Sequence, residues 1–165
     1  MTTDTADAIS TAAASADAAL ARLQDIVRRI SDGDLHRAHR DGGWSVAQVV
    51  SHVNVCTLLW LGDIERLRHD PELGFFFREE IGHDALGYPP PTAEIAFRQL
   101  DSTRRTLASC LPATPPETLS RTVEIPDLGR MTIAEWTPLI IGHLTGHVDQ
   151  AVAILRDRDA MPEGL

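Results

Sequence analysis

The sequence predicts an all-α fold in which four helices pack as a bundle, and three observations support this prediction. Apolar residues recur three and four positions apart through four long segments, which is the period of a helix with one buried face. Residues that break or cap helices separate these segments. With 165 residues, of which 43% are hydrophobic and 24% charged, the chain suits a single globular domain spanning residues 1–165.

The first predicted helix spans Thr5–Ile30, and small alanines on its apolar face permit close helix packing. The sequence Ser31-Asp32-Gly33 is expected to end it. The second predicted helix, Val46–His69, follows Ser45, whose hydroxyl can accept a hydrogen bond from the first turn. It is expected to stop at Asp70-Pro71, because proline disfavours a helical residue before it.

The third predicted helix runs from Thr92 to Leu111 and ends before Pro112. The fourth runs from Thr132 to Asp157, and Thr132 and Glu135 match a capping box at its start. Pro138 lies inside this last segment. We expect a kink there, and the alternative is that Thr137 forms a second N-cap with Pro138 in the first turn.

Two connections are long enough to carry structure of their own. Residues 70–91 include Phe75–Phe77 and Tyr88 before three prolines, and we expect this loop to cover one end of the bundle with its aromatic side chains in the core. A lid or pocket wall is the alternative. Residues 122–131 alternate in polarity around a Pro-Asp-x-Gly turn, so they predict a small hairpin before the last helix.

Charge and composition exclude some classes of partner. A net charge of −9 argues against binding nucleic acid or an anionic membrane, because both require Lys and Arg to neutralise phosphate. The chain shows neither a secretory signal nor an apolar stretch long enough to span a bilayer, so a cytoplasmic location is expected. Cys56 and Cys110 have no disulfide-like spacing and are expected to be reduced.

The residues that most need explanation are His143 and His147, which lie one helical turn apart on the stripe expected to face the core. Such a pair can direct two ring nitrogens at one ion. His52, at the border of the apolar face of the second helix, is the best third ligand, although core histidines without a metal are the alternative.

Neighbouring residues allow two interpretations each. Gly142 and Gly146 precede the two histidines, and they predict close approach by another helix or by a ligand. Cys56 follows His52 by one turn, and we expect a small buried hydrophobe there, with approach to the site as a ligand as the alternative. Polar residues that could support the ligands or contact substrate are Gln48, Asn54, Asp63, Asp149 and Gln150. For each of them taken singly, a solvated polar position on a helix is the preferred interpretation.

Two segments resemble the signature regions of the DinB/YfiT-like superfamily. They are Gly43-Trp44-Ser45-Val46-Ala47-Gln48-Val49-Val50-Ser51-His52 and Thr132-Ile133-Ala134-Glu135-Trp136 followed by His143-Leu144-Thr145-Gly146-His147-Val148-Asp149-Gln150. The resemblance covers nearly the whole chain in helix order and segment length. It implies an antiparallel four-helix bundle with a long crossover loop, a homodimer, and a divalent metal held by His52, His143 and His147.

The Gly-Trp-Ser opening also resembles the N-terminal domain of mycothiol-dependent maleylpyruvate isomerases. Those enzymes carry a glutamate at the position of His143, so the resemblance does not imply isomerisation of maleylpyruvate here.

Three neutral imidazoles leave the charge of a metal uncompensated and a coordination position open, as in catalytic sites. The leading functional prediction is a divalent-metal-dependent enzyme, a thiol-cofactor-dependent S-transferase or isomerase that acts on small electrophiles. Zinc or nickel is the expected metal, and a low-molecular-weight thiol such as mycothiol is the expected cofactor. The alternatives are a metal-dependent hydrolase and a non-catalytic, stress-related bundle that binds a small molecule. The sequence identifies no catalytic residue beyond the three ligands.

Overall fold

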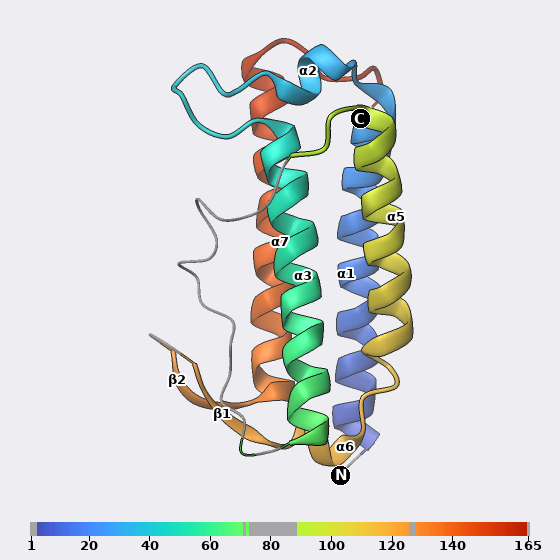
Figure 1. Cartoon of the computed structure of the whole chain (residues 1–165), viewed down its shortest axis with the longest axis vertical. Coiled ribbons are helices and arrows are strands. Elements are labelled where there is room, and N and C mark those ends of the chain that lie inside the picture. The colour runs from blue at the N-terminus through green and yellow to red at the C-terminus, as the bar shows by residue number, and fades with distance from the viewer. Residues whose placement is uncertain (1–2, 71, 73–88, 126–127, 165) are drawn as a thin grey trace.

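The computed structural model describes residues 3–70, 72, 89–125 and 128–164, and its framework is a bundle of four long helices (Figure 1). The all-α prediction is confirmed, and the helix ends lie within two residues of the predicted ones. The helices are α1 (Thr3–Arg29), α3 (Val46–His69), α5 (Ala93–Cys110) and α7 (Ile133–Asp157).

The order of the helices around the bundle confirms the predicted crossover. Helices α1 and α3 each pack against both α5 and α7. Figure 1 shows that α1 and α7 run in one direction and that α3 and α5 run in the other. The pairs α1–α5 and α3–α7 are therefore antiparallel, whereas α3 and α5 are parallel neighbours. The end of α3 and the start of α5 therefore lie at opposite ends of the bundle, as a crossover requires.

The described residues include two short helices that were not predicted. Helix α2 (Asp32–His36) starts one residue after Ser31, whose hydroxyl accepts a hydrogen bond from the backbone of Asp34. Helix α6 (Pro116–Leu119) precedes the hairpin. The residues expected merely to end the first helix therefore begin α2, because a helix of five residues is too short to show a hydrophobic period and depends on its cap.

The predicted hairpin is present between α6 and α7. Strands β1 (Thr122–Ile125) and β2 (Gly129–Thr132) pair antiparallel, with Val123 opposite Met131. Val123 and Ile125 are buried and attach the hairpin to the bundle. Gly129 has a φ of +77°, which favours glycine because it lacks a Cβ. The Pro-Asp part of the predicted turn lies outside the described residues.

Helix α7 continues through Pro138 as one element. The hydroxyl of Thr137 donates to the carbonyl oxygen of Ile133 at 2.8 Å, which is a bond within the helix and not an N-cap. The interpretation of Thr137 as a second N-cap is therefore wrong. Pro138 lies near the start of a long helix, where the loss of one backbone donor leaves the packing of the later turns in place.

The core lies between the four long helices and is dominated by aliphatic side chains. Trp60 of α3 and Trp136 of α7 meet edge to face in it, with ring centroids 6.1 Å apart. Phe75–Phe77 and Tyr88, predicted to cover one end of the bundle, lie outside the described residues. Within the described part of the chain, no helix combines the length and apolar character needed to cross a membrane.

Candidate metal centre

The start of α3 fixes the position of His52. The Ser45 hydroxyl accepts from the backbone N–H of Gln48 at 3.3 Å, and Oε1 of Gln48 accepts from the backbone N–H of Ser45 at 2.9 Å. This reciprocal pair is a capping box, which satisfies two backbone donors at the helix start. His52 lies seven residues after Ser45, close to two helical turns, and its side chain is buried.

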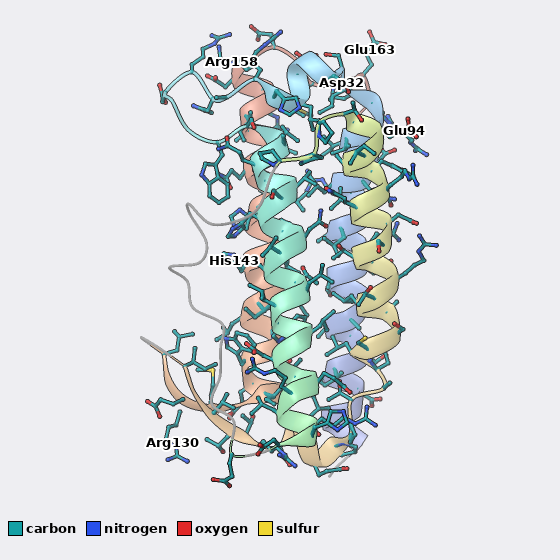
Figure 2. All side chains as sticks on the ribbon, in the orientation of Figure 1. Asp32, Glu94, Arg130, His143, Arg158 and Glu163 are labelled. Carbon is teal, nitrogen blue, oxygen red and sulfur yellow. The ribbon has the colours of Figure 1, made fainter. Side chains whose placement is uncertain are left out.

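Helix α7 carries His143 and His147 at the seam with α3. Its start is fixed by a second capping box, formed by Thr132 and Glu135. Leu144 is fully buried, whereas His143 and His147 are accessible to solvent. Figure 2 shows His143 on the α3 and α7 side of the bundle, away from α1 and α5. The expectation that both histidines face the core was therefore wrong, because they lie at the edge of the apolar stripe.

The three predicted histidines nevertheless come together. Nε2 of His52 lies 3.0 Å from Nε2 of His143, and Nε2 of His147 lies 3.1 Å from the same His143 atom. The ring centroids of His52 and His147 are 4.3 Å apart. Two antiparallel helices, α3 and α7, thus place three imidazoles in mutual contact, with one Nε2 within reach of both others.

Hydrogen bonding of His147 shows why this arrangement suits a cation. Nδ1 of His147 lies 2.8 Å from Oε1 of Gln150, which can only accept, so Nδ1 carries a hydrogen and Nε2 of the neutral ring is bare. The contact with His143 then needs a hydrogen on Nε2 of His143. Because that hydrogen is donated to His147, Nε2 of His143 can neither donate to nor accept from Nε2 of His52, which lies equally close. A cation near the three nitrogens satisfies both contacts at once.

The distances between the nitrogens fit a single ion. Two imidazole nitrogens that bind one zinc at about 2.0–2.1 Å lie about 3.3 Å apart at a tetrahedral angle and about 2.9 Å apart at a right angle. The observed separations of 3.0 and 3.1 Å lie between these values. The donor chemistry and its spacing therefore fit the divalent metal that the sequence predicts.

The indole of Trp44 forms one wall of this cluster. It stacks on His147 with centroids 5.7 Å apart and planes 12° apart, and it lies 4.9 Å from the ring of His52. Trp44 is half-buried and immediately precedes the cap residue Ser45, so the start of α3 positions it too. An aromatic face against two imidazoles limits their rotation and excludes water from that side.

Cys56 is also part of the cluster. It is buried one turn after His52, and its Sγ lies 3.5 Å from Nε2 and 3.7 Å from Nδ1 of that ring. The donor atoms of His52, Cys56 and His143 all lie within 4.8 Å of one another. Burial raises the pKa of the Cys56 thiol to about 12. The burial agrees with the prediction of a small buried hydrophobe, and the proximity to the histidines agrees with the alternative that Cys56 approaches the site.

Of the polar residues proposed to support the ligands, Gln150 is bonded to one of the three histidines. The other four have partners within their own helix or on a neighbouring one. Gln48 caps α3, the Asn54 side-chain oxygen accepts from Thr103 at 2.8 Å, and Asp63 and Asp149 pair with Arg66 and Arg22. Three further histidines have partners outside the cluster, which are Pro91 for His36, Asp41 for His39 and Glu65 for His69.

Gly142 and Gly146 do not mediate helix packing. A Cβ built at either position would meet no atom of the described residues within 4 Å. Both glycines are exposed on α7. The prediction of close approach by another helix is therefore wrong for the described chain, because this side of α7 faces away from α1 and α5. Approach by a ligand stays a prediction.

Comparisons with known proteins agree with this architecture. The sequence model of the DinB superfamily matches residues 15–151. Among solved structures, the chain is similar to YfiT from Bacillus subtilis, with a TM-score of 0.74 and 17% sequence identity. The match covers 96% of this chain and 90% of YfiT, which is described as a probable metal-dependent hydrolase with an unusual four-helix bundle topology. A comparison with curated proteins finds no match.

Proposed function

This chain belongs to the DinB superfamily, and on that premise we propose that it is a divalent-metal-dependent enzyme whose ion is held by His52, His143 and His147. The observation that carries the proposal is the approach of Nε2 of His143 to within 3.0 and 3.1 Å of the other two Nε2 atoms. Zinc and nickel suit an all-imidazole set of donors.

The protein residues around the ion would have distinct tasks. Gln150 holds His147 in the tautomer whose Nε2 carries the lone pair needed to bind an ion. Trp44 stacks on the face of His147, lies beside the tilted ring of His52, and limits the movement of both rings. His52 is buried, whereas His143 is accessible, so a small substrate would approach from the side of His143.

The neutral donor set favours thiol chemistry. An ion held by three uncharged imidazoles lowers the pKa of a thiol or water that it binds. A thiol with a pKa of about 8.5 ionises near neutral pH with less assistance than water, whose pKa is far higher. The leading proposal is therefore transfer of a low-molecular-weight thiol, such as mycothiol, to a small electrophile. The sulfur bonds to carbon, the leaving group departs with its electron pair, and the thiol proton goes to solvent.

Hydrolysis is the second candidate, and the likeness to YfiT supports it. The same three histidines would then activate water in place of a thiol. A bundle that binds a small molecule without catalysis is the third candidate. Chelation separates it from the enzymes, because a binding protein without a catalytic ion would keep its function after the metal is removed.

The first experiment measures the metal content of untagged protein, since a histidine tag would add sites of its own. We expect one equivalent of divalent metal per chain in the wild type and a loss in His52→Ala, His143→Ala and His147→Ala. His69→Ala is the matched control, because that histidine is exposed and contacts Glu65. Equal metal in all variants, or none in the wild type, rejects the site.

The second experiment measures the reaction. Metal-loaded protein should accelerate conjugation of a chlorobimane with one thiol from a panel of mycothiol, bacillithiol, glutathione and cysteine, and His143→Ala should abolish the effect. If no thiol reacts faster with metal-loaded than with metal-free protein, while a neutral ester or amide is turned over in a metal-dependent manner, hydrolysis replaces transfer as the function.

A further inference from the structure

We infer that Cys56 supplies a fourth protein ligand, a thiolate, to the ion held by the three histidines, so that the resting site is closed until an incoming ligand displaces that sulfur. This inference rests on the proposed function. It adds Cys56 to the ligands of the proposed site. It also limits the class of substrate, because an incoming molecule must displace a bound thiolate.

The spacing along α3 places the sulfur on the correct side of the helix. His52 and Cys56 are four residues apart, so their side chains are neighbours on one face. This is the same spacing by which His143 and His147 meet on α7. Each of the two antiparallel helices thus contributes an i, i+4 pair to one cluster.

The distances fit a nitrogen and a sulfur bound to one ion. At tetrahedral angles, with metal bonds of about 2.0–2.1 Å to nitrogen and about 2.3 Å to sulfur, the two donors lie about 3.5 Å apart. Sγ of Cys56 lies 3.5 Å from Nε2 of His52. The donor atoms of Cys56, His52 and His143 also form one group within 4.8 Å. Sγ also lies 3.7 Å from Nδ1 of the same ring, so the sulfur and the ring of His52 must turn relative to each other before both can bind one ion.

The sulfur of Cys56 lies on the buried side of the site. Cys56 is 4% exposed and lies on the protein side of the cluster, whereas His143 is accessible to solvent. An external ligand would therefore arrive opposite the side that Cys56 occupies. Because sulfur competes better than water for zinc-like ions, a thiol is the class of small molecule suited to displacing Cys56. This condition favours the transferase over the hydrolase.

Cobalt(II) provides a test that does not depend on activity, because a thiolate bound to cobalt gives a charge-transfer absorption band in the near ultraviolet. Metal-free wild-type protein and the variants Cys56→Ser, Cys56→Ala and Cys110→Ser are titrated with cobalt(II). Cys110→Ser is the matched control, since Cys110 is exposed at the end of α5. We expect the charge-transfer band in the wild type and in Cys110→Ser, and its loss in both Cys56 variants, with visible ligand-field bands retained in all four.

Each other outcome has a defined meaning. Ligand-field bands without a charge-transfer band in the wild type would overturn the role of Cys56 while leaving the three-histidine site in place. A charge-transfer band that persists in both Cys56 variants would also overturn it. If cobalt produces no bands in the wild type, the proposed function fails, and this inference fails with it. Two Cys56 variants are used so that poor folding of one, checked by circular dichroism, does not decide the result.

Discussion

Gln150 accepts a hydrogen bond from Nδ1 of His147 at 2.8 Å, across one turn of α7. Because this bond determines which ring nitrogen carries the hydrogen, it prepares Nε2 of His147 to face His143. Gln150 thus determines the tautomer of one of the three proposed ligands. None of its described contacts is with His52, His143 or Cys56.

Replacing Gln150 should therefore weaken metal binding. We expect Gln150→Leu to lower zinc affinity by about 10- to 100-fold, the usual effect of losing a hydrogen bond behind a metal-binding histidine. Competition with a chromophoric chelator measures the affinity. Asp149→Asn is the control on the same turn, because Asp149 is exposed and pairs with Arg22. Equal affinities for wild type and Gln150→Leu would contradict the role of this bond.

The histidine variants should remain folded, but to different degrees. His143 is accessible, so His143→Ala should change the unfolding free energy of the metal-free protein by less than about 0.5 kcal/mol. His52 is 6% exposed, and His52→Ala should cost about 1–3 kcal/mol. Thermal melts with and without zinc measure both effects.

Zinc itself should stabilise the wild type, by about 2.7 kcal/mol at a free concentration one hundred times Kd. Neither variant should show this gain. Unfolding of metal-free His143→Ala would indicate that the histidine has a structural role.

Alanine at Gly142 or Gly146 should stabilise the metal-free protein. Both residues are in the interior of α7, and an added Cβ meets no described atom within 4 Å. Each substitution is expected to raise the unfolding free energy by about 0.5–1 kcal/mol, because alanine loses less backbone entropy in a helix. Denaturant titration measures it. Gly129→Ala is the contrasting variant and should destabilise, since Gly129 has a φ of +77°.

The ion pair between Asp17 and Arg104 should make a small, pH-dependent contribution. Nε and Nη2 of Arg104 donate to the two carboxylate oxygens of Asp17 at 2.8 and 2.9 Å, linking α1 to α5. The hydrogen bond from Arg104 lowers the pKa of Asp17. A lowered pKa stabilises the folded state above the pKa of the unfolded chain, about 4, and that stability is lost as pH falls through the folded-state pKa.

Asp17→Asn should therefore be less stable than the wild type at pH 7, by under about 1 kcal/mol because the pair is partly exposed. The difference should shrink as the pH falls below about 4. Urea titrations at several pH values measure it, with Asp101→Asn as the control for a more exposed pair. A difference that is constant with pH would mean that lost packing, and not charge, explains the effect.

The sequence predicted the long helices well because their boundaries depend on local chemistry. Ser45 and Thr132 form the capping boxes that their sequences indicate, and α3 ends at His69 as expected. Helix α2 was missed because five residues are too few to show the hydrophobic periodicity of a helix. The three-histidine cluster could be predicted because helical spacing places His143 beside His147, and His52 lies at a helix border.

What the spacing could not specify was the direction in which these side chains face. A stripe that contains His143 and Leu144 looks like one apolar face, yet neighbouring residues on a helix diverge by about 100°, enough to bury one and expose the other. Cys56 was placed correctly in the interior, but only the packing of α3 on α7 sets it against the proposed ligands. Metal ligation, the thiol cofactor, the homodimer and the cytoplasmic location stay predictions.

The two capping boxes allow the loops to vary in length without moving the ligands. His52 lies seven residues after Ser45 and His143 eleven after Thr132, close to two and three full turns. Each histidine therefore leaves its helix at nearly the same angle as the cap residue that starts it. Insertions before Ser45 or within the hairpin leave these angles unchanged, whereas one residue inserted between cap and histidine would rotate the ligand by about 100°. Natural variation in length should accumulate outside these two intervals.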